Sequence, residues 1–406
     1  MLVLFGVYPV TQKREPTRWQ GAMLMIYFDN AATTMDKPDE VVQAVARALT
    51  TFGGPGRGVH GASMAAAAAV WEARESAARI FDAPQASRVA FGANATWALN
   101  VAIAGLLPDG GRALTTAASH NSVLRPLFRA RDMRGCAIDV APIAADGALD
   151  LETYGRLLDR KPDIVVATHA SNVTGDVYDV RSMAEAAHGS GALFVLDVAQ
   201  TAGSQAVSCK DLGVDVLCFT GHKSLFGPQG TGGLVVADGV EIAPPFEGGT
   251  GVRSFDERQP PNMPESLEAG TANAHGLAGL AAGIEYVESI GVGVIAERVA
   301  ALTARFEAGA AAIGGMRVLG GAGSKRSGIV AVVSEDVDAA VLAEHLWSDF
   351  GICVRAGAHC APLMHRALGT AESEAVRFSF SCRNTPDEVD AGLNAIEHIV
   401  REVRRA

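Results

Sequence analysis

The sequence contains few cysteines for its length, six in 406 residues. They are Cys136, Cys209, Cys218, Cys353, Cys360 and Cys382. No two of them form a CxxC pair, and none stands with histidines at zinc-finger spacing, so the sequence predicts no metal site. So few cysteines in so long a chain are typical of reduced thiols rather than of a disulfide framework. We therefore expect a cytoplasmic protein in which most of these thiols are buried as small hydrophobic side chains.

Charge is also scarce, since only 19% of the residues are Asp, Glu, Lys or Arg and the formal net charge is −11. Without a Lys/Arg cluster, the chain has no surface suited to nucleic acid or to anionic membrane. Residues 89–108 carry no charge over about the length of a bilayer span, but Gly92, Asn94 and Pro108 interrupt them. We interpret this stretch as a strand, a glycine turn and a buried helix. Residues 1–10 are apolar but lack the basic start of a signal peptide. We expect no membrane partner.

What the sequence does have is hydrophobic residues, 49% of the total, enough to bury a large core. Helical periodicity runs through 39–50 and 64–80. Four short apolar runs follow, at 165–169, 193–197, 215–220 and 232–237. Buried strands separated by helices predict an α/β fold with a mostly parallel sheet covered on both faces. Ligands of such sheets bind at the carboxyl ends of the strands.

The remaining segments differ from this pattern in composition and in the elements that they predict. Residues 244–271 are rich in Pro, Gly and charge, which indicates a long functional loop. A helical stretch is expected over 274–312, and 316–406 reads as a compact α/β tail. Its predicted strands lie near 328–333 and 375–381, and its closing helix spans 386–404.

These patterns predict two domains. The large domain is expected over residues 39–285. The small domain combines 25–38 with 286–406. We interpret residues 1–24 as an N-terminal extension, either disordered or the result of a misassigned start codon, because a more protein-like run begins at Met25.

A lysine and an acid stand at the ends of two of the apolar runs. Lys223 stands three residues after the end of the run 215–220, and Asp197 ends the run 193–197, with Gln200 three residues later. An acid at the end of a buried strand is costly unless it has a cationic partner. A protonated pyridine nitrogen is such a partner, and a reactive lysine with an Asp–pyridinium pair is the arrangement that pyridoxal 5'-phosphate requires.

Two further segments complete that arrangement. In residues 92–100 a glycine-containing turn opens a helix, where backbone N–H groups and the Thr96 hydroxyl can bind a phosphate. In residues 118–126 a loop after a short strand carries His120, whose flat imidazole can stack on a cofactor ring. Either feature alone is a weak signal, and together with Lys223 and Asp197 they predict one cofactor site.

The order and spacing of the motifs carry a resemblance. They are YFDNAATT (27–34), RGVH (57–60), SNVTG (171–175), DVAQ (197–200), GHK and GPQGTGG within 221–233, EAGT (268–271), VRAGAHC (354–360) and RFSFSCRNTPDEVD (377–390). Over residues 26–404 the chain resembles the class V aminotransferase family of fold-type I pyridoxal-phosphate enzymes, and within it the cysteine desulfurase branch. The resemblance implies a fold-type I α/β architecture, with a mostly parallel sheet in the large domain and a smaller α/β C-terminal domain.

The resemblance also implies roles for individual residues. Lys223 would form the Schiff base, Asp197 would pair with the pyridine nitrogen, and His120 would stack on the ring. Gln200 would hydrogen-bond the ring hydroxyl. The implied phosphate contacts are Ala95 through its backbone, Thr96, Thr220, His222 and, donated by the partner subunit, Thr271. A homodimer with shared active sites follows from the last of these.

For the substrate, the resemblance implies L-cysteine, which is converted to L-alanine. Arg377 would receive the substrate carboxylate, a planar pairing suited to guanidinium. Asn172 would lie beside that carboxylate, and Arg355 is a further expected substrate-binding residue. Cys360 would take the sulfur as a persulfide and pass it to an acceptor protein, in sulfur mobilisation for iron–sulfur cluster assembly.

Other readings stay open at this point. On the same fold, a selenocysteine lyase, a cysteine-conjugate lyase or a class V aminotransferase would use most of these residues. An accessory protein that holds the cofactor or carries sulfur without turnover is a reading from another class. The sequence departs from the family pattern at Ala95, where some relatives have a hydroxyl, at Trp97, where an acidic residue is common, and at Ala358, where a second histidine often lies.

Overall fold

The computed structural model describes residues 18–19, 23–56, 58–321 and 323–405. Most of the N-terminal extension expected at 1–24 therefore lies outside the described residues. Its described part consists of β1 (Arg18–Trp19) and β2 (Met23–Leu24), which pair antiparallel.

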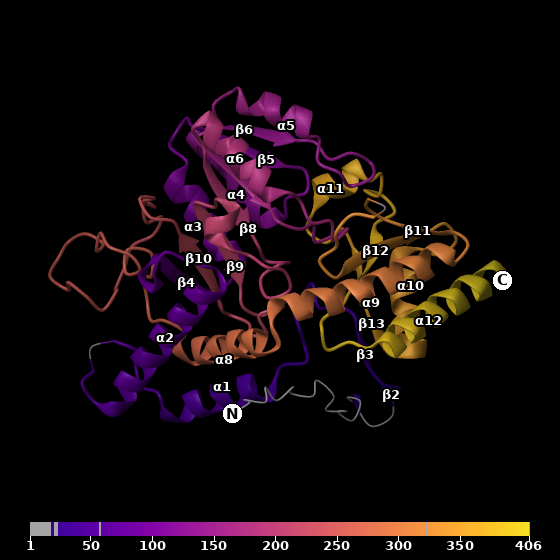
Figure 1. The fold of residues 1–406 in the computed structure, drawn as a ribbon, viewed down its shortest axis with the longest axis horizontal. Helices are drawn as coiled ribbons and strands as arrows, with labels where there is room; N and C mark the ends of the chain where they lie inside the picture. The colour runs from indigo at the N-terminus through magenta and orange to yellow at the C-terminus, as the bar shows by residue number, and fades with distance from the viewer. Residues whose placement is uncertain (1–17, 20–22, 57, 322, 406) are drawn as a thin grey trace, which may run out of the picture.

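A seven-stranded sheet forms the centre of the larger part of the molecule (Figure 1). In spatial order its strands are β4 (Val89–Gly92), β10 (Gly232–Val236), β9 (Val216–Thr220), β8 (Leu193–Asp197), β7 (Ile164–Thr168), β5 (Arg112–Thr116) and β6 (Ala137–Ala141). Only β10 runs against its neighbours, and the other pairings are parallel. The prediction of a mostly parallel sheet is confirmed.

Helices cover both faces of this sheet. Because side chains on both faces are buried, its strands are continuous runs of apolar residues. In β8, Phe194 and Leu196 point to one core and Val195 to the other. The helices are α1 (Asp39–Thr51), α2 (Gly61–Ile80), α3 (Ala95–Leu106), α4 (Asn121–Arg134), α5 (Leu151–Leu158), α6 (Val180–Ser190), α7 (Cys209–Leu212) and α8 (Ala274–Ile290), with a short 3-10 turn η1 at Ala86–Arg88. Side chains of α2, α5, α6 and α8 fill the first core, and those of α3 and α4 fill the second.

The helical stretch expected over 274–312 is confirmed, and it consists of two helices. α8 ends at Ile290, and α9 (Val292–Ala312) sets off at 79° to it. Gly291 makes the corner with a φ of 90°, a left-handed value that a side chain would disfavour. The corner sends α9 from the first sheet toward the second (Figure 1). Within the described residues no single helix is long and apolar enough to cross a membrane, and this bent pair passes only a test of length and composition.

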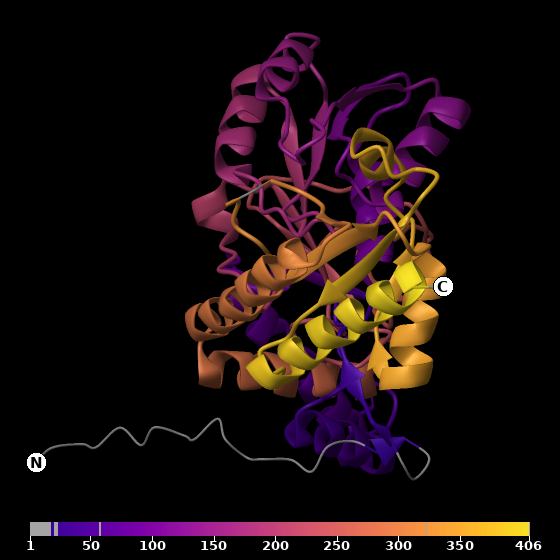
Figure 2. The same cartoon turned by 90° about the vertical axis from the view of Figure 1, so that its right-hand side faces the viewer.

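A four-stranded antiparallel sheet forms the second part of the molecule. Its strands, in spatial order, are β11 (Met316–Val318), β12 (Ile329–Ser334), β15 (Ala375–Ser379) and β14 (Arg355–Gly357), and the remaining elements are α10 (Ala339–Phe350), β13 (Ile352–Cys353), α11 (Pro362–Ala367) and α12 (Pro386–Arg405). The helices α9, α10 and α12 lie against this sheet (Figure 2). Their side chains share one core with it. β3 (Ile26–Tyr27) pairs with β13, so the segment after residue 25 joins this part. The exact domain boundaries stay a prediction.

Residues 244–271 contain no helix or strand and form the loop that projects at the left of Figure 1. The long loop predicted over these residues is thus present, and its functional role stays a prediction.

Candidate active site

The predicted site residues gather at the carboxyl edge of the large sheet, where it faces β14 and β15. A cavity of about 230 Å³ lies there. It is lined by Ala95, Thr96, His120, Asn172, Asp197, Gln200, Thr220, His222, Lys223, Arg355, Cys360 and Arg377. Strands β5, β7, β8 and β9 all end at this edge, so residues that are far apart in the sequence meet in one place. Thr271 is the one predicted site residue that does not line the cavity.

Lys223 follows β9 and lines the cavity. Burial lowers the pKa of this amine to about 8, against the opposing attraction of Asp197. A lysine with such a pKa is a far better nucleophile and base near neutral pH than an exposed one.

Asp197 ends β8 and is only 5% exposed. Its Oδ1 accepts a hydrogen bond from the Ala199 backbone N–H at 2.9 Å. Burial raises the pKa of this carboxyl, while Ala199 and the charge of Lys223 act in the opposite direction. A carboxylate in such a place is stable only beside a cation.

His120 caps the N-terminus of α4, and its Nδ1 accepts a hydrogen bond from the Ser122 backbone N–H at 3.0 Å. Burial lowers the pKa of the ring to about 4, so the ring is neutral at physiological pH and carries its proton on Nε2. The Ser122 hydroxyl links Nδ1, at 2.9 Å, to the Thr96 hydroxyl, at 2.7 Å. Sequence reasoning missed Ser122, although its place two residues after a capping histidine is a signal for it.

The turn before α3 has the features of an anion site. Asn94 caps the helix by accepting a hydrogen bond from the Trp97 N–H at 3.0 Å, which leaves the other N–H groups of the first turn free for a ligand. Gly232 in β10 permits the close approach, because a Cβ there would lie 2.7 Å from the Asn94 Cα. The buried Thr220 hydroxyl has no hydrogen-bond partner. It requires a ligand group or a water.

His222 and Gln200 are held on the N-terminal segment. His222 Nδ1 lies 3.0 Å from the Thr33 hydroxyl, and burial lowers the pKa of the ring to about 4. Gln200 donates its amide N–H to the Ala31 carbonyl at 3.2 Å. Residues of the YFDNAATT motif therefore orient two of the predicted cofactor contacts.

Arg377 is 3% exposed and lies at the back of the cavity on β15. Its Nη2 donates to Asp29 Oδ1 at 2.9 Å and its Nη1 to the Asn172 backbone carbonyl at 3.1 Å, while its Nε has no partner. Asn172 in turn donates its side-chain N–H to the His359 carbonyl at 2.6 Å. Sequence reasoning missed Asp29, which stands inside a quoted motif but carries no signal of its partner.

Cys360 is exposed at the mouth of the cavity, on the loop between β14 and α11. Arg355 lies exposed nearby at the start of β14. Four of the remaining cysteines are buried, and Cys353 is half-buried with the pKa of its thiol raised, first by burial. Cys360 is thus the accessible thiol among the described cysteines.

The comparison with known families decides the identity. The model of the family described as "Aminotransferase class-V" matches residues 26–391. The chain belongs to the class V aminotransferase family.

Its relatives within the family share one name. A probable cysteine desulfurase of Methanothermobacter thermautotrophicus is 32% identical, over 92% of this chain and 94% of its own length. Probable cysteine desulfurase 2 of Mycobacterium leprae is 33% identical over 94% of both. Among solved structures, the apo cysteine desulfurase of Thermococcus onnurineus NA1 has a TM-score of 0.88 and 32% identity, covering 93% of this chain and 95% of that one. The fold-type I prediction is confirmed.

Members of the class V aminotransferase family generally use pyridoxal phosphate, and the residues present fit that group. The unpartnered Thr220 hydroxyl and the free N–H groups of α3 suit its phosphate. The buried Asp197 carboxyl suits a protonated ring nitrogen, and the Lys223 amine suits an aldehyde.

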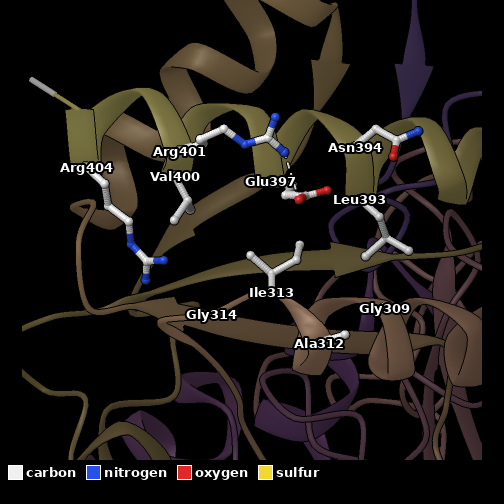
Figure 3. A pocket seen from close by; sticks show the side chains of 10 residues that line it. All are labelled: Gly309, Ala312, Ile313, Gly314, Leu393, Asn394, Glu397, Val400, Arg401 and Arg404. Atoms are coloured by element: carbon white, nitrogen blue, oxygen red, sulfur yellow. Dashed lines mark hydrogen bonds and ion pairs between the residues drawn. The ribbon is translucent and has the colours of Figure 1, made fainter.

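A second hollow lies between α9 and α12, away from this chemistry (Figure 3). Its charged side chains are already paired, Arg401 with Glu397 and Arg404 with Asp336, both at 2.8 Å. No cluster of three or more His, Cys, Asp or Glu suited to a metal occurs in the described part of the chain.

Proposed function

We propose that this chain is a pyridoxal-phosphate-dependent cysteine desulfurase, which converts L-cysteine to L-alanine and receives the sulfur on Cys360. The observation that carries the proposal is the exposed Cys360 thiol at the mouth of the cavity that also contains Lys223 and Arg377. An aminotransferase has no use for a thiol at that place. The names of the relatives support the same activity.

Residues from four strand ends would bind the cofactor. Asp197 would pair with the ring nitrogen, His120 would stack on the ring, and Gln200 would contact the ring hydroxyl. The proposed phosphate contacts are the backbone of Ala95, Thr96, Thr220 and His222. When bound, the cofactor supplies an electron-withdrawing ring that makes the substrate α-proton acidic and the Cβ–S bond labile.

Arg377 would bind the substrate carboxylate. Its Nη2 donates to Asp29 and its Nη1 donates to the Asn172 carbonyl, and these two bonds hold the guanidinium in place. Its Nε has no partner, so it can donate to a substrate carboxylate that enters the cavity. Asn172 would sit beside the carboxylate and Arg355 would attract it at the entrance. The substrate is thereby oriented with its sulfur toward Cys360.

Two residues would then move the proton and the sulfur. The neutral Lys223 amine removes the α-proton. The Cys360 thiolate attacks the substrate sulfur, so that an S–S bond forms while the Cβ–S bond breaks. The electron pair of the broken bond stays on carbon, which takes up a proton to become the methyl group of alanine. Lys223 would then return a proton to the α-carbon. Cysteine and a thiolate thus become alanine and an enzyme persulfide, with no external oxidant.

The assembly and destination of the protein belong to the same proposal. Thr271 is exposed and lies outside the cavity, which suits a phosphate contact donated across a homodimer. The exposure of Cys360 suits delivery of sulfur to an acceptor protein for iron–sulfur cluster assembly. We propose the cytoplasm as its location, where such thiols stay reduced.

The test is product analysis with the cofactor-loaded protein, L-cysteine and a reductant. A desulfurase releases alanine and sulfide in equal amounts without an amino acceptor. A 2-oxo acid product that depends on an added acceptor would instead indicate an aminotransferase. L-Selenocysteine and a cysteine conjugate, tested in parallel, separate the two lyase alternatives, since a lyase specific for either would leave L-cysteine unchanged.

A further inference from the structure

A chain of buried hydrogen bonds closes the loop that carries Cys360. The His359 ring lies between the two ends of that loop. Its Nε2 is 3.0 Å from the Arg355 backbone carbonyl, and its Nδ1 is 3.3 Å from Nε2 of His365. The His365 Nδ1 is 2.8 Å from the Thr370 hydroxyl. The three side chains come from the loop, from α11 and from the turn after it, and all three are buried.

The direction of every bond in this chain follows from one end. The Arg355 carbonyl can only accept, so His359 Nε2 carries a proton and, in a neutral ring, Nδ1 is an acceptor. His365 must then donate from Nε2, and its Nδ1 accepts from Thr370. Burial lowers the pKa of both rings, that of His359 to about 3, which keeps both neutral. The rings also stack, with centroids 5.5 Å apart and planes at 17°.

The loop needs such support because its backbone is strained. His359 has a φ of 50° and Cys360 a φ of 57°, two successive non-glycine residues in the left-handed region. Residues persist there only where the surroundings fix them from several sides. The carbonyls of both residues are held by two donors from outside the loop, the Asn172 side chain after β7 at 2.6 Å and the backbone N–H of Asn121 at the start of α4 at 2.8 Å.

We propose that His365 is a positioning residue for Cys360. Through its bond to His359 it ties the end of the loop to its beginning, and so holds the thiol in the direction that sulfur transfer requires. This inference rests on the proposed role of Cys360. Without the His365 donor, Nδ1 of His359 would be buried without a hydrogen-bond partner, which is costly. The His359 ring would then lose one of the two bonds that fix its orientation.

The experiment uses the cofactor-loaded protein with three variants. His365→Phe removes the donor but keeps a flat buried ring, and His365→Gln keeps an N–H at a similar reach. Thr370→Val weakens the chain at its outer end. His345→Phe is the matched control, because His345 is exposed on α10 and pairs only with Asp349.

Two steps are measured separately. Exchange of the substrate α-proton with solvent depends on Lys223 and Arg377 and should stay as in the wild type. Alanine formation depends on Cys360 and should fall about ten-fold or more in His365→Phe, because small misplacements of a reacting group are costly. His365→Gln should recover most of the rate, and Thr370→Val should show a smaller loss. Amide hydrogen exchange over 355–361, which needs no turnover, should speed up in His365→Phe and stay slow in His365→Gln.

Several results would overturn the proposal. One is a lowered melting temperature in His365→Phe with normal alanine formation, which marks a purely structural residue. Another is an equal loss of α-proton exchange and alanine formation. If His365→Phe does not fold, unchanged alanine formation in Thr370→Val refutes the proposal instead. A wild type that forms no alanine from L-cysteine refutes the proposed function itself, whatever the exchange data show.

Discussion

Burial sets the protonation states around the cavity. The pKa values of Lys223, His120, His222 and His359 are all lowered, with burial as the first cause in each case. Removal from water disfavours the charged form of a base. The rings are therefore neutral near pH 7, and the amine is partly neutral. Arg355 and Arg377, which line the same cavity, are therefore the permanent cations that face an anionic substrate.

The first prediction concerns the pH dependence of Lys223 in the cofactor-free protein. Only the neutral amine reacts with aldehydes or acylating reagents, so its reactivity should rise as pH increases through about 8 and level off above that value. Peptide mass spectrometry after brief acylation over a pH series gives the profile. The exposed Lys210, acylated in the same samples, serves as the control for the activity of the reagent. A Lys223 reactivity that keeps rising well above about pH 8, with no plateau, would contradict the lowered pKa.

At the scale of the elements, a buried ion cluster joins the loop after β7 to the segment before β12. Arg326 lies 3.4 Å from Asp176, and its Nε lies 2.9 Å from Glu307 on α9. Arg326 also donates to backbone carbonyls of Thr174, Leu319 and Gly321. The cluster fixes the loop that contains Asn172 against the second sheet.

The second prediction follows from that burial. Arg326→Ala should lower the free energy of unfolding by about 3–5 kcal/mol, because it leaves the Asp176 carboxylate buried without its cation. Chemical denaturation followed by circular dichroism measures the change. The control is Arg401→Ala, which breaks an exposed pair with Glu397 and should cost less than about 0.5 kcal/mol. Equal, small effects of both substitutions would show that the cluster contributes little.

The elements differ in how well the sequence predicts them. The strands ending at Asp197 and Thr220 are apolar runs followed by polar residues, and the structure has them within a residue or two of the expected bounds. The corner at Gly291 was missed because hydrophobic periodicity continues on both sides of it. The 79° angle between α8 and α9 depends on the backbone conformation of Gly291, and hydrophobic periodicity carries no information about the conformation of a single glycine.

At the scale of the whole molecule, the site is assembled from both sheets. The family resemblance named the cavity residues, and the α/β pattern by itself accounts for Asp197 and Thr220, which end two of the predicted strands. Partners across the two sheets were not predictable, as Asn172 with the His359 carbonyl and Arg377 with the Asn172 carbonyl show. Their pairing depends on how distant segments pack, which local patterns do not encode.

The third prediction tests the shared site. Neither Lys223→Ala nor Thr271→Asp homodimers should turn over cysteine, the first for lack of the amine and the second because the new charge repels the cofactor phosphate. Mixing the two subunits should restore roughly a quarter of the wild-type rate, since each mixed dimer has one intact site. Light scattering should show dimers throughout. A Ser373→Asp control, exposed before β15, should be fully active. No recovery on mixing would place Thr271 outside the partner's site.

The most direct test of the account locates the sulfur. After incubation of the cofactor-loaded protein with L-cysteine, peptide mass spectrometry should find one extra sulfur atom on Cys360. Cys360→Ala should lose nearly all alanine formation from L-cysteine and keep the absorbance of the bound cofactor. Cys353→Ala and Cys382→Ala should turn over normally, because these thiols are half-buried and buried. A persulfide on another cysteine, or normal turnover by Cys360→Ala, would contradict the account.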